Sequence, residues 1–218
     1  MGYAGSALRE AGATLTSAQF IDVGSKDDDI KLGSIIPIAA KGVDLGGNIE
    51  IQFLNFDGSS DMDNDYYWDG ESTWLKDGSD EANDVVIPAG HGLWVSNTSG
   101  APVSLRSSGQ VNEKEILFPI RTAGATAAAN AFPVDTTFGK VVPIADAGVD
   151  LGGNIEIQYL NFDGSSDMDN DYYWDGESTW LKDGSDEAND VVIPAGRGLW
   201  VSNTAGAPVS IQITAPEL

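Results

Sequence analysis

The chain has 218 residues, with 34 acidic side chains against 11 basic ones, a formal net charge of −23, one histidine and no cysteine. So few basic residues argue against binding through phosphate groups, and nucleic acid is not an expected partner. The lack of cysteine excludes disulfides, thiol nucleophiles and zinc–thiolate sites. A hydrophobic fraction of 41% indicates folded domains rather than a disordered acidic tail.

Membrane and export signals are not visible in the sequence. No stretch reaches the roughly 18 apolar residues that a membrane-spanning helix needs, so no membrane insertion is expected. The first twenty residues show neither a basic start nor an apolar run, and therefore no signal peptide.

The chain is a tandem duplication. Residues 43–98 and 149–204 match at a constant offset of 106, and two of these 56 positions differ: Phe53 becomes Tyr159 and His91 becomes Arg197. A weaker match relates residues 9–20 to residues 121–132 at an offset of 112. We therefore expect two domains, residues 1–110 and residues 111–218, each long enough to own a core.

Short strand signals run along the first copy. Residues 11–18, rich in alanine, threonine and glycine, are predicted to form an extended arm or an edge strand. Residues 48–53 alternate and place Ile49, Ile51 and Phe53 on one face. Residues 66–68 and 73–75 flank Asp69-Gly70, which predicts a hairpin.

The next segments keep the same character. Residues 85–87 and 93–95 are β-rich runs separated by Pro88-Ala89-Gly90, and we expect them to pair as a hairpin. Residues 103–105 alternate again. Residues 123–131 are predicted as an edge strand, an extended arm or a short helix. The pattern as a whole predicts an all-β fold of two tandem, near-identical β-sandwich or small β-barrel domains.

The strongest chemical signal is an acidic stretch in each copy. Residues 56–84 hold ten carboxylates against one lysine, and the second copy repeats them. Asp61, Asp63 and Asp65 stand at alternate positions, so their side chains can converge on one hard cation, and calcium prefers six to eight oxygen ligands. The predicted calcium ligands are Asp57, Asp61, Asp63, Asp65 and Asp69, with Asp163, Asp167, Asp169, Asp171 and Asp175 in the second copy.

The acidic pattern begins like an EF-hand loop but departs from it. Tyr66 occupies the position that requires glycine, and Ser72 stands where the bidentate glutamate belongs. We therefore expect a non-EF calcium loop on a β scaffold. The alternative is a solvated acidic surface. Residues 43–98 carry a net charge of −11 and residues 149–204 carry −10, so nearly all of the excess charge lies in the two copies.

No enzyme is predicted. His91 is the single histidine, and Arg197 replaces it in the second copy, so a nucleophilic triad is not available. We expect His91, in a glycine-flanked turn, to be exposed. Acids near Trp68 and Trp74 are compatible with glycoside hydrolysis, but nothing singles out one of them as a carboxyl of raised pKa.

Each copy also contains three tryptophans, which are Trp68, Trp74 and Trp94 in the first and Trp174, Trp180 and Trp200 in the second. Exposed aromatic rings beside carboxylates suit sugars, because sugar CH groups stack on the ring while acids accept hydroxyl protons. The alternative is that the rings fill two small cores. Polysaccharide is therefore an alternative partner.

The duplication suggests a route to self-assembly. If the second domain of one chain packs on the first domain of the next, as the two pack within a chain, the contact is head-to-tail and propagates into a filament. Residues 111–120 have no full counterpart before Arg9. The first domain is therefore predicted to lack a strand that a neighbouring chain supplies, with residues 209–213 as the candidate donor.

A duplicated, aspartate-rich, cysteine-free β domain with the segment P-A-G-x-G-L-W-V at residues 88–95 resembles subunits of bacterial extracellular fibres and surface layers. The resemblance is architectural and assigns no functional residue. We expect a non-enzymatic structural subunit, extracellular or at the cell surface, that self-assembles head-to-tail into a filament or layer stabilised by calcium. The alternatives are a tandem carbohydrate-binding or adhesion module and a viral tail or fibre protein.

Overall fold

A computed structural model describes residues 2–8, 10, 12–16, 30–52, 65–158 and 171–215. These residues form antiparallel sheets and two short 3-10 helices, η1 (Leu32–Ser34) and η2 (Phe138–Lys140), which confirms the predicted all-β class. Within the same ranges, no helix has the length and apolar character that crossing a membrane requires. We call residues 1–110 the first repeat and residues 111–218 the second repeat.

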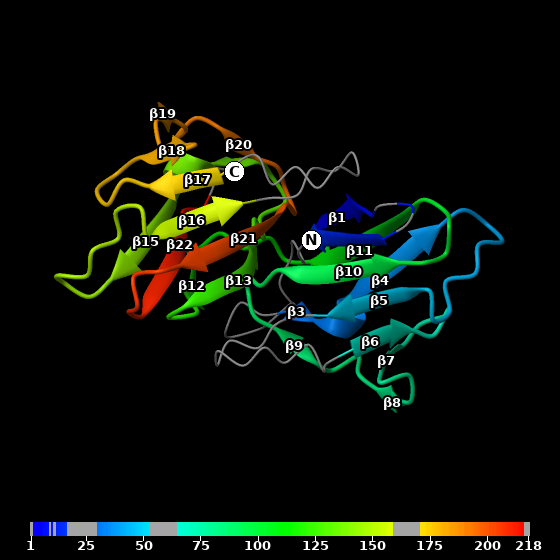
Figure 1. Ribbon diagram of the computed structural model, residues 1–218. Coiled ribbons are helices and arrows are strands. Elements are labelled where there is room, and N and C mark those ends of the chain that lie inside the picture. The colour runs from blue at the N-terminus through cyan, green and yellow to red at the C-terminus, as the bar shows by residue number, and fades with distance from the viewer. Residues whose placement is uncertain are drawn as a thin grey trace.

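The first repeat consists of a three-stranded sheet, a six-stranded sheet and one small ladder (Figure 1). The three-stranded sheet has the order β1 (Gly2–Ala7), β11 (Val103–Gly109), β4 (Ile35–Ala39). The six-stranded sheet has the order β2 (Gly12–Thr16), β10 (Leu93–Asn97), β5 (Ile49–Gln52), β6 (Asp65–Trp68), β7 (Trp74–Lys76), β8 (Asp80–Glu81). β3 (Ile30–Lys31) pairs with β9 (Val86–Ile87).

The second repeat has the same architecture. Its three-stranded sheet has the order β12 (Ile116–Ile120), β22 (Val209–Ile213), β15 (Val141–Ala145). Its six-stranded sheet has the order β13 (Gly124–Ala129), β21 (Gly198–Asn203), β16 (Ile155–Gln158), β17 (Asp171–Trp174), β18 (Trp180–Lys182), β19 (Asp186–Glu187). β14 (Thr136–Thr137) pairs with β20 (Val192–Ile193). All the described sheets are open, so each repeat is a sandwich rather than a closed structure.

The core of each repeat lies between its two sheets and follows from alternation along the strands. Ile49 and Ile51 on β5 are buried, as predicted, and Val103 and Leu105 on β11 face them from the other layer. Phe53, predicted for the same face, lies outside the described residues. Trp74 joins the layers, because its indole Nε1 donates a hydrogen bond of 2.8 Å to the carbonyl oxygen of Ile35. Trp180 makes the equivalent bond in the second repeat, 2.7 Å to Val141.

Local strand predictions are largely confirmed. β6 and β7 form the predicted hairpin, with Trp68 opposite Trp74 and their rings in edge-to-face contact at 5.3 Å. Residues 12–16 and 124–129 are edge strands of the two six-stranded sheets, so the short helix considered for residues 123–131 is wrong. β-Branched Thr126 and Gly124, which weaken a helix, agree with this outcome.

Two predictions about strand pairing are wrong. Residues 85–87 and 93–95 do not pair with each other, because β9 joins β3 while β10 lies between β2 and β5. The first repeat does not lack a strand, since β1 occupies the edge next to β11 that β12 occupies next to β22. The proposed donor, residues 209–213, is β22, which is already paired on both sides by β12 and β15.

The two repeats meet through their six-stranded sheets, at the ends of β10, β13 and β21 in the middle of the molecule (Figure 1). One antiparallel bridge joins Thr16 to Arg197, and another joins His91 to Ala128. Offsets of 112 and 106 make Ala128 the counterpart of Thr16 and Arg197 the counterpart of His91. Both sides of the contact therefore use the same positions, which is the property of an isologous, two-fold interface. The head-to-tail contact expected between different chains is a separate matter and stays a prediction.

His91 is buried rather than exposed, as is Arg197, with 3% and 5% of their surfaces accessible. A glycine-flanked turn is typical of an exposed surface, but these glycines allow the two repeats to approach each other closely. A Cβ on Gly92 would lie 2.7 Å from the carbonyl oxygen of Ala128, and a Cβ on Gly198 would collide with Leu15. The glycines thus create the contact that covers the histidine and the arginine.

Candidate functional site

The predicted calcium ligands are placed only in part. Asp57, Asp61, Asp63, Asp163, Asp167 and Asp169 lie outside the described residues. Asp65 begins β6 and Asp69 follows its last residue, so their Cα atoms are separated by four residues of strand, roughly 13 Å. Asp171 and Asp175 are spaced in the same way along β17, and the ligand assignment of these four residues stays a prediction. Among the residues that the structure places, no group of three metal-binding side chains occurs.

Asp69 closes the turn between β6 and β7. Its Oδ1 accepts hydrogen bonds from the backbone N–H groups of Glu71, Ser72 and Thr73 at 2.8, 2.9 and 3.0 Å. These bonds, the one from Thr73 above all, hold the pKa of Asp69 below its ordinary value. Asp175 makes the same three bonds in the second repeat. The Oδ1 atoms of Asp69 and Asp175 therefore stabilise the two hairpin turns by binding their backbone N–H groups.

Asp65 belongs to a different group, on the outward face of the six-stranded sheet. We call this group the outer-face cluster: Glu50, Gln52, Asp65, Tyr67 and Trp94 in the first repeat, and Glu156, Gln158, Asp171, Tyr173 and Trp200 in the second. Strand register unites its members, because Gln52 lies between Trp94 and Asp65, and Glu50 lies opposite Tyr67. Directly opposite residues share a sheet face, so the five side chains form one patch.

Gln52 holds the two acids of the outer-face cluster together. Its Nε2 donates to Glu50 Oε1 at 3.0 Å and to Asp65 Oδ1 at 2.6 Å. Gln158 repeats both bonds at 2.8 and 2.7 Å, to Glu156 and Asp171. Both amide hydrogens of the glutamine are therefore donated to carboxylates, and the carboxylates keep lone pairs that can accept further hydrogen bonds.

The electrostatics of the cluster are those of partly buried acids. Burial raises the pKa of Glu50, and the negative charge of Asp65 raises it further, while hydrogen bonds from Tyr67 and Gln52 act in the opposite direction. Burial, with the charges of Glu50 and Asp65, also raises the pKa of Tyr67. The tyrosine hydroxyl is therefore a neutral donor at physiological pH. Glu156 and Tyr173 show the same directions.

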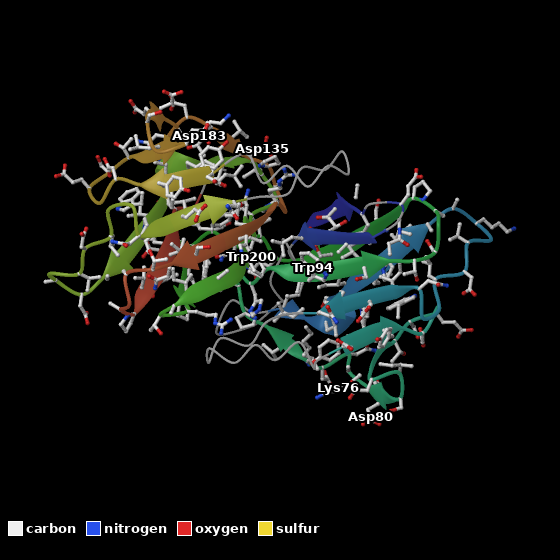
Figure 2. All side chains as sticks on the ribbon, viewed as in Figure 1. Lys76, Asp80, Trp94, Asp135, Asp183 and Trp200 are labelled. Atoms are coloured by element: carbon white, nitrogen blue, oxygen red, sulfur yellow. The ribbon has the colours of Figure 1, made fainter. Side chains whose placement is uncertain are left out.

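Trp94 is the aromatic member whose ring is not in the core. Trp68, Trp74, Trp174 and Trp180 are buried, whereas Trp94 and Trp200 are half-buried. Figure 2 shows Trp94 on β10 toward the middle of the molecule, with Lys76 and Asp80 at the far end of the same sheet. The core alternative therefore holds for four of the six tryptophans, and two remain available to a ligand.

The opposite layer of each sandwich presents an outer surface that is poor in acids; among the described residues Glu115 lies at its border in the second repeat and accepts a hydrogen bond of 2.6 Å from Gln212. We call these surfaces the apolar faces. In the first repeat the apolar face carries Ile36 and Ile38 of β4, 44% and 42% exposed, beside Ser104 and Arg106 of β11. In the second it carries Leu117 and Ile144, 60% and 41% exposed, with Pro119, Val142, Ser210 and Gln212. In a chain with 34 acids, these faces carry few charged side chains.

Alternation along the strands carries a sequence signal for the outer-face cluster. Glu50 and Gln52 alternate with buried isoleucines, as Asp65 and Tyr67 alternate with Tyr66 and Trp68, so each pair had to face outward. What the pattern could not supply was the pairing of β5 with β6 and of β10 with β5. The apolar faces had a similar signal in Ile36 and Ile38, which alternate with Ile35 and Pro37.

Comparison with known proteins adds no family to this geometry. No protein-family model matches the chain, no curated protein matches it, and no solved structure matches it.

Proposed function

We propose that the protein is a non-enzymatic structural subunit that self-assembles outside the cell or at its surface. The observation that supports this is the pair of apolar faces, one on each repeat. Exposed apolar surface on a soluble-type sandwich marks contact surfaces. Copies that carry a charge of −23 repel each other, and the acid-poor apolar faces are where two copies approach with the least repulsion. Two such faces per chain allow assembly to continue beyond a dimer.

Calcium is part of the same proposal. The acidic residues 53–64 run from the end of β5 to the start of β6, and residues 159–170 do so in the second repeat. A bound cation would neutralise their carboxylates and lower the repulsion between subunits. We expect thermal unfolding to move to higher temperature when calcium replaces EDTA, by the equivalent of about 2.7 kcal/mol at 100 times the Kd. An unchanged melting temperature would remove calcium from the proposal.

The assembly surface is tested by charge. Leu117→Glu combined with Ile144→Glu places two acids on the apolar face of the second repeat, and we expect it to abolish concentration-dependent assembly measured by light scattering and sedimentation. Val192→Glu is the matched control, because Val192 is 48% exposed but lies on β20, away from that face. Equal assembly of the two variants, or a wild-type chain that stays monomeric at high concentration with calcium, would refute the proposal.

A second candidate function, carbohydrate binding, is favoured by the outer-face cluster. A half-buried tryptophan beside two carboxylates and a tyrosine hydroxyl offers a sugar both a stacking ring and hydrogen-bond partners, in two copies. Trp94→Ala with Trp200→Ala should then lose retention on a polysaccharide column. Leu75→Ala with Leu181→Ala, half-buried on the same faces, should keep it. If neither wild type nor variants are retained by a panel of polysaccharides, this candidate is wrong.

A further inference from the structure

The contact between the repeats is self-complementary, because each repeat contributes an equivalent surface to it. β2, the edge strand of the first repeat, runs beside residues 196–198 of the second. β13, the edge strand of the second repeat, runs beside residues 90–92 of the first. Gly92 N–H donates to the carbonyl of Ala127 at 3.0 Å, and Ala129 N–H donates to that of Gly90 at 2.9 Å. The hydroxyl of Thr16 donates to the carbonyl oxygen of Gly196 at 2.9 Å. The repeats are thus joined by specific backbone bonds and not by loose apposition.

The two repeats have separate buried cores, although Ala89 packs against the core of the second repeat and Gly90 lies close to Ile116 and Phe118. One hydrophobic cluster contains buried residues from 8 to 105, and the other contains buried residues from 116 to 213, so no buried member is shared. Residues 110–115 connect β11 to β12, and Gln110, Glu113, Lys114 and Glu115 of this connection are exposed. Opening the connection would therefore break the contact between the repeats and withdraw Ala89 and Gly90 from the second core, while the strand pairing within each sandwich remains.

We propose that the same contact also forms between chains, so that the first repeat of one molecule docks on the second repeat of another by exchange. This inference rests on the self-assembly proposed above and names a surface and a partner for it: a second copy of this chain. Each open chain then offers one free edge at either end. Exchange can close a dimer or continue as an open series, in which the second repeat of one chain follows the first repeat of the next.

Interface residues that differ between the repeats favour this unlike pairing. In the observed contact Arg197 faces Thr16, and His91 faces Ala128. Two second repeats docked on each other would bring two buried Arg197 side chains to one interface, and like charges in a buried contact are costly. They would also lose the hydroxyl of Thr16, because Ala128 cannot donate. The exchanged contact therefore keeps the order first repeat on second repeat.

Mass action sets the condition for exchange. A tethered partner acts at an effective concentration of the order of millimolar, so a dilute chain pairs its own two repeats. Exchange then increases with protein concentration, and it increases further wherever the apolar faces hold chains together.

Cysteine trapping tests the proposal in the full chain, which has no cysteine of its own. His91 and Ala128 form a non-hydrogen-bonded antiparallel pair, as the bonds of Gly92 and Ala129 show, and such pairs have Cα atoms about 4.5 Å apart. This spacing permits a disulfide. A His91→Cys chain carrying a mass tag is mixed with an untagged Ala128→Cys chain, oxidised mildly at rising concentration, and run on a non-reducing gel. Neither chain can form the bond alone.

We expect a tagged–untagged disulfide that increases with concentration, roughly tenfold or more above random collision, because docking holds the two sulfurs at high effective concentration. The control is His91→Cys mixed with Ser79→Cys, since Ser79 is exposed at a turn far from the contact. A yield equal to that control at every concentration overturns the proposal. If buried cysteine at 91 or 128 prevents folding, as circular dichroism would reveal, the counterpart pair Thr16→Cys and Arg197→Cys gives the same test.

The outcome is separable from the proposed function. Wild-type assembly without trapped disulfides would show that exchange is wrong while self-assembly through the apolar faces stands. Trapped disulfides in the Leu117→Glu, Ile144→Glu background would support exchange and show that it does not need those faces.

Discussion

The first and second repeats agree along β5, β6, β7 and β10 and their counterparts, and differ where the repeats face each other. The inner residues of these strands, among them Trp68, Trp74 and their counterparts, are the same in both. At the contact, however, the first repeat has Leu15, Thr16 and His91 where the second repeat has Ala127, Ala128 and Arg197. The difference separates two requirements: the inner faces of these strands use the same residues in both repeats, whereas the contact accepts different residues on its two sides.

The largest expected effect tests the likeness of the cores. Trp74→Ala and Trp180→Ala each empty the centre of a sandwich and remove the indole bond between its layers, and we expect each to lower the free energy of unfolding by about 3–5 kcal/mol. Trp180 also contacts Phe138 at 5.6 Å, where the first repeat has Leu32. The second variant should therefore lose about 0.5–1.5 kcal/mol more. Chemical denaturation measures both, and equal losses would show that Phe138 adds nothing.

An intermediate effect tests the difference at the contact. Gly198→Ala drives a methyl group into Leu15, and Gly92→Ala drives one against the backbone of Ala127 and Ala128. We expect each to cost about 1–3 kcal/mol, with the larger cost at Gly198. The repeats should part while their sandwiches persist, which small-angle scattering reports as a longer particle with unchanged circular dichroism. Gly139→Ala is the control, because its Cβ would lie 3.3 Å from the nearest atom, in the second repeat's own structure. A particle of wild-type length would contradict the assigned contact.

The smallest effect concerns Glu50 and Glu156, which should behave alike. The pKa of each is raised in the folded protein, so the folded state binds the proton more tightly than the unfolded one. The ionised carboxylate therefore costs stability at neutral pH, and this cost disappears as the pH falls toward the ordinary value of 4.5. Glu50→Gln should slightly raise the melting temperature at pH 7 and leave it unchanged near pH 4. A lower melting temperature at pH 7 would show that the charge is needed by its neighbours.

Asp69 gives the opposite sign on the same sheet. Its pKa is lowered by bonds from the backbone, so its contribution to stability is present above the ordinary value of 3.8 and is lost as the pH falls through the lower, folded-state value. Asp69→Ala should therefore destabilise the hairpin at pH 7 and approach the wild type in strong acid, in the same melting series.

Local features of this fold could be predicted from the sequence, whereas remote pairings could not. Alternation in residues 48–53 and the turn at Asp69-Gly70 act within a few residues, so the buried isoleucines and the β6–β7 hairpin followed directly. The partners of β9 and β1 lie over fifty residues away along the chain, at β3 and β11, and neither periodicity nor turn residues specify such register.

The candidate site shows the same limit. Glu50, Gln52, Asp65 and Tyr67 come together only once β5 and β6 are aligned, and their side-chain bonds depend on that alignment. The prediction that His91 is exposed is wrong, because the sequence Gly-His-Gly is typical of exposed turns. The three residues alone cannot indicate that the second repeat, which residues 110–115 connect to the first, covers this turn.

The two-fold relation between covalently linked repeats has a consequence for how the contact can vary. In a dimer of identical chains every substitution at the interface occurs twice, so a residue that fits on one side must also fit on the other. Fusion removes this condition, and a buried histidine on one side can coexist with a buried arginine on the other. The linked repeats therefore keep a two-fold symmetric contact, while the residues on each side of that contact can change independently.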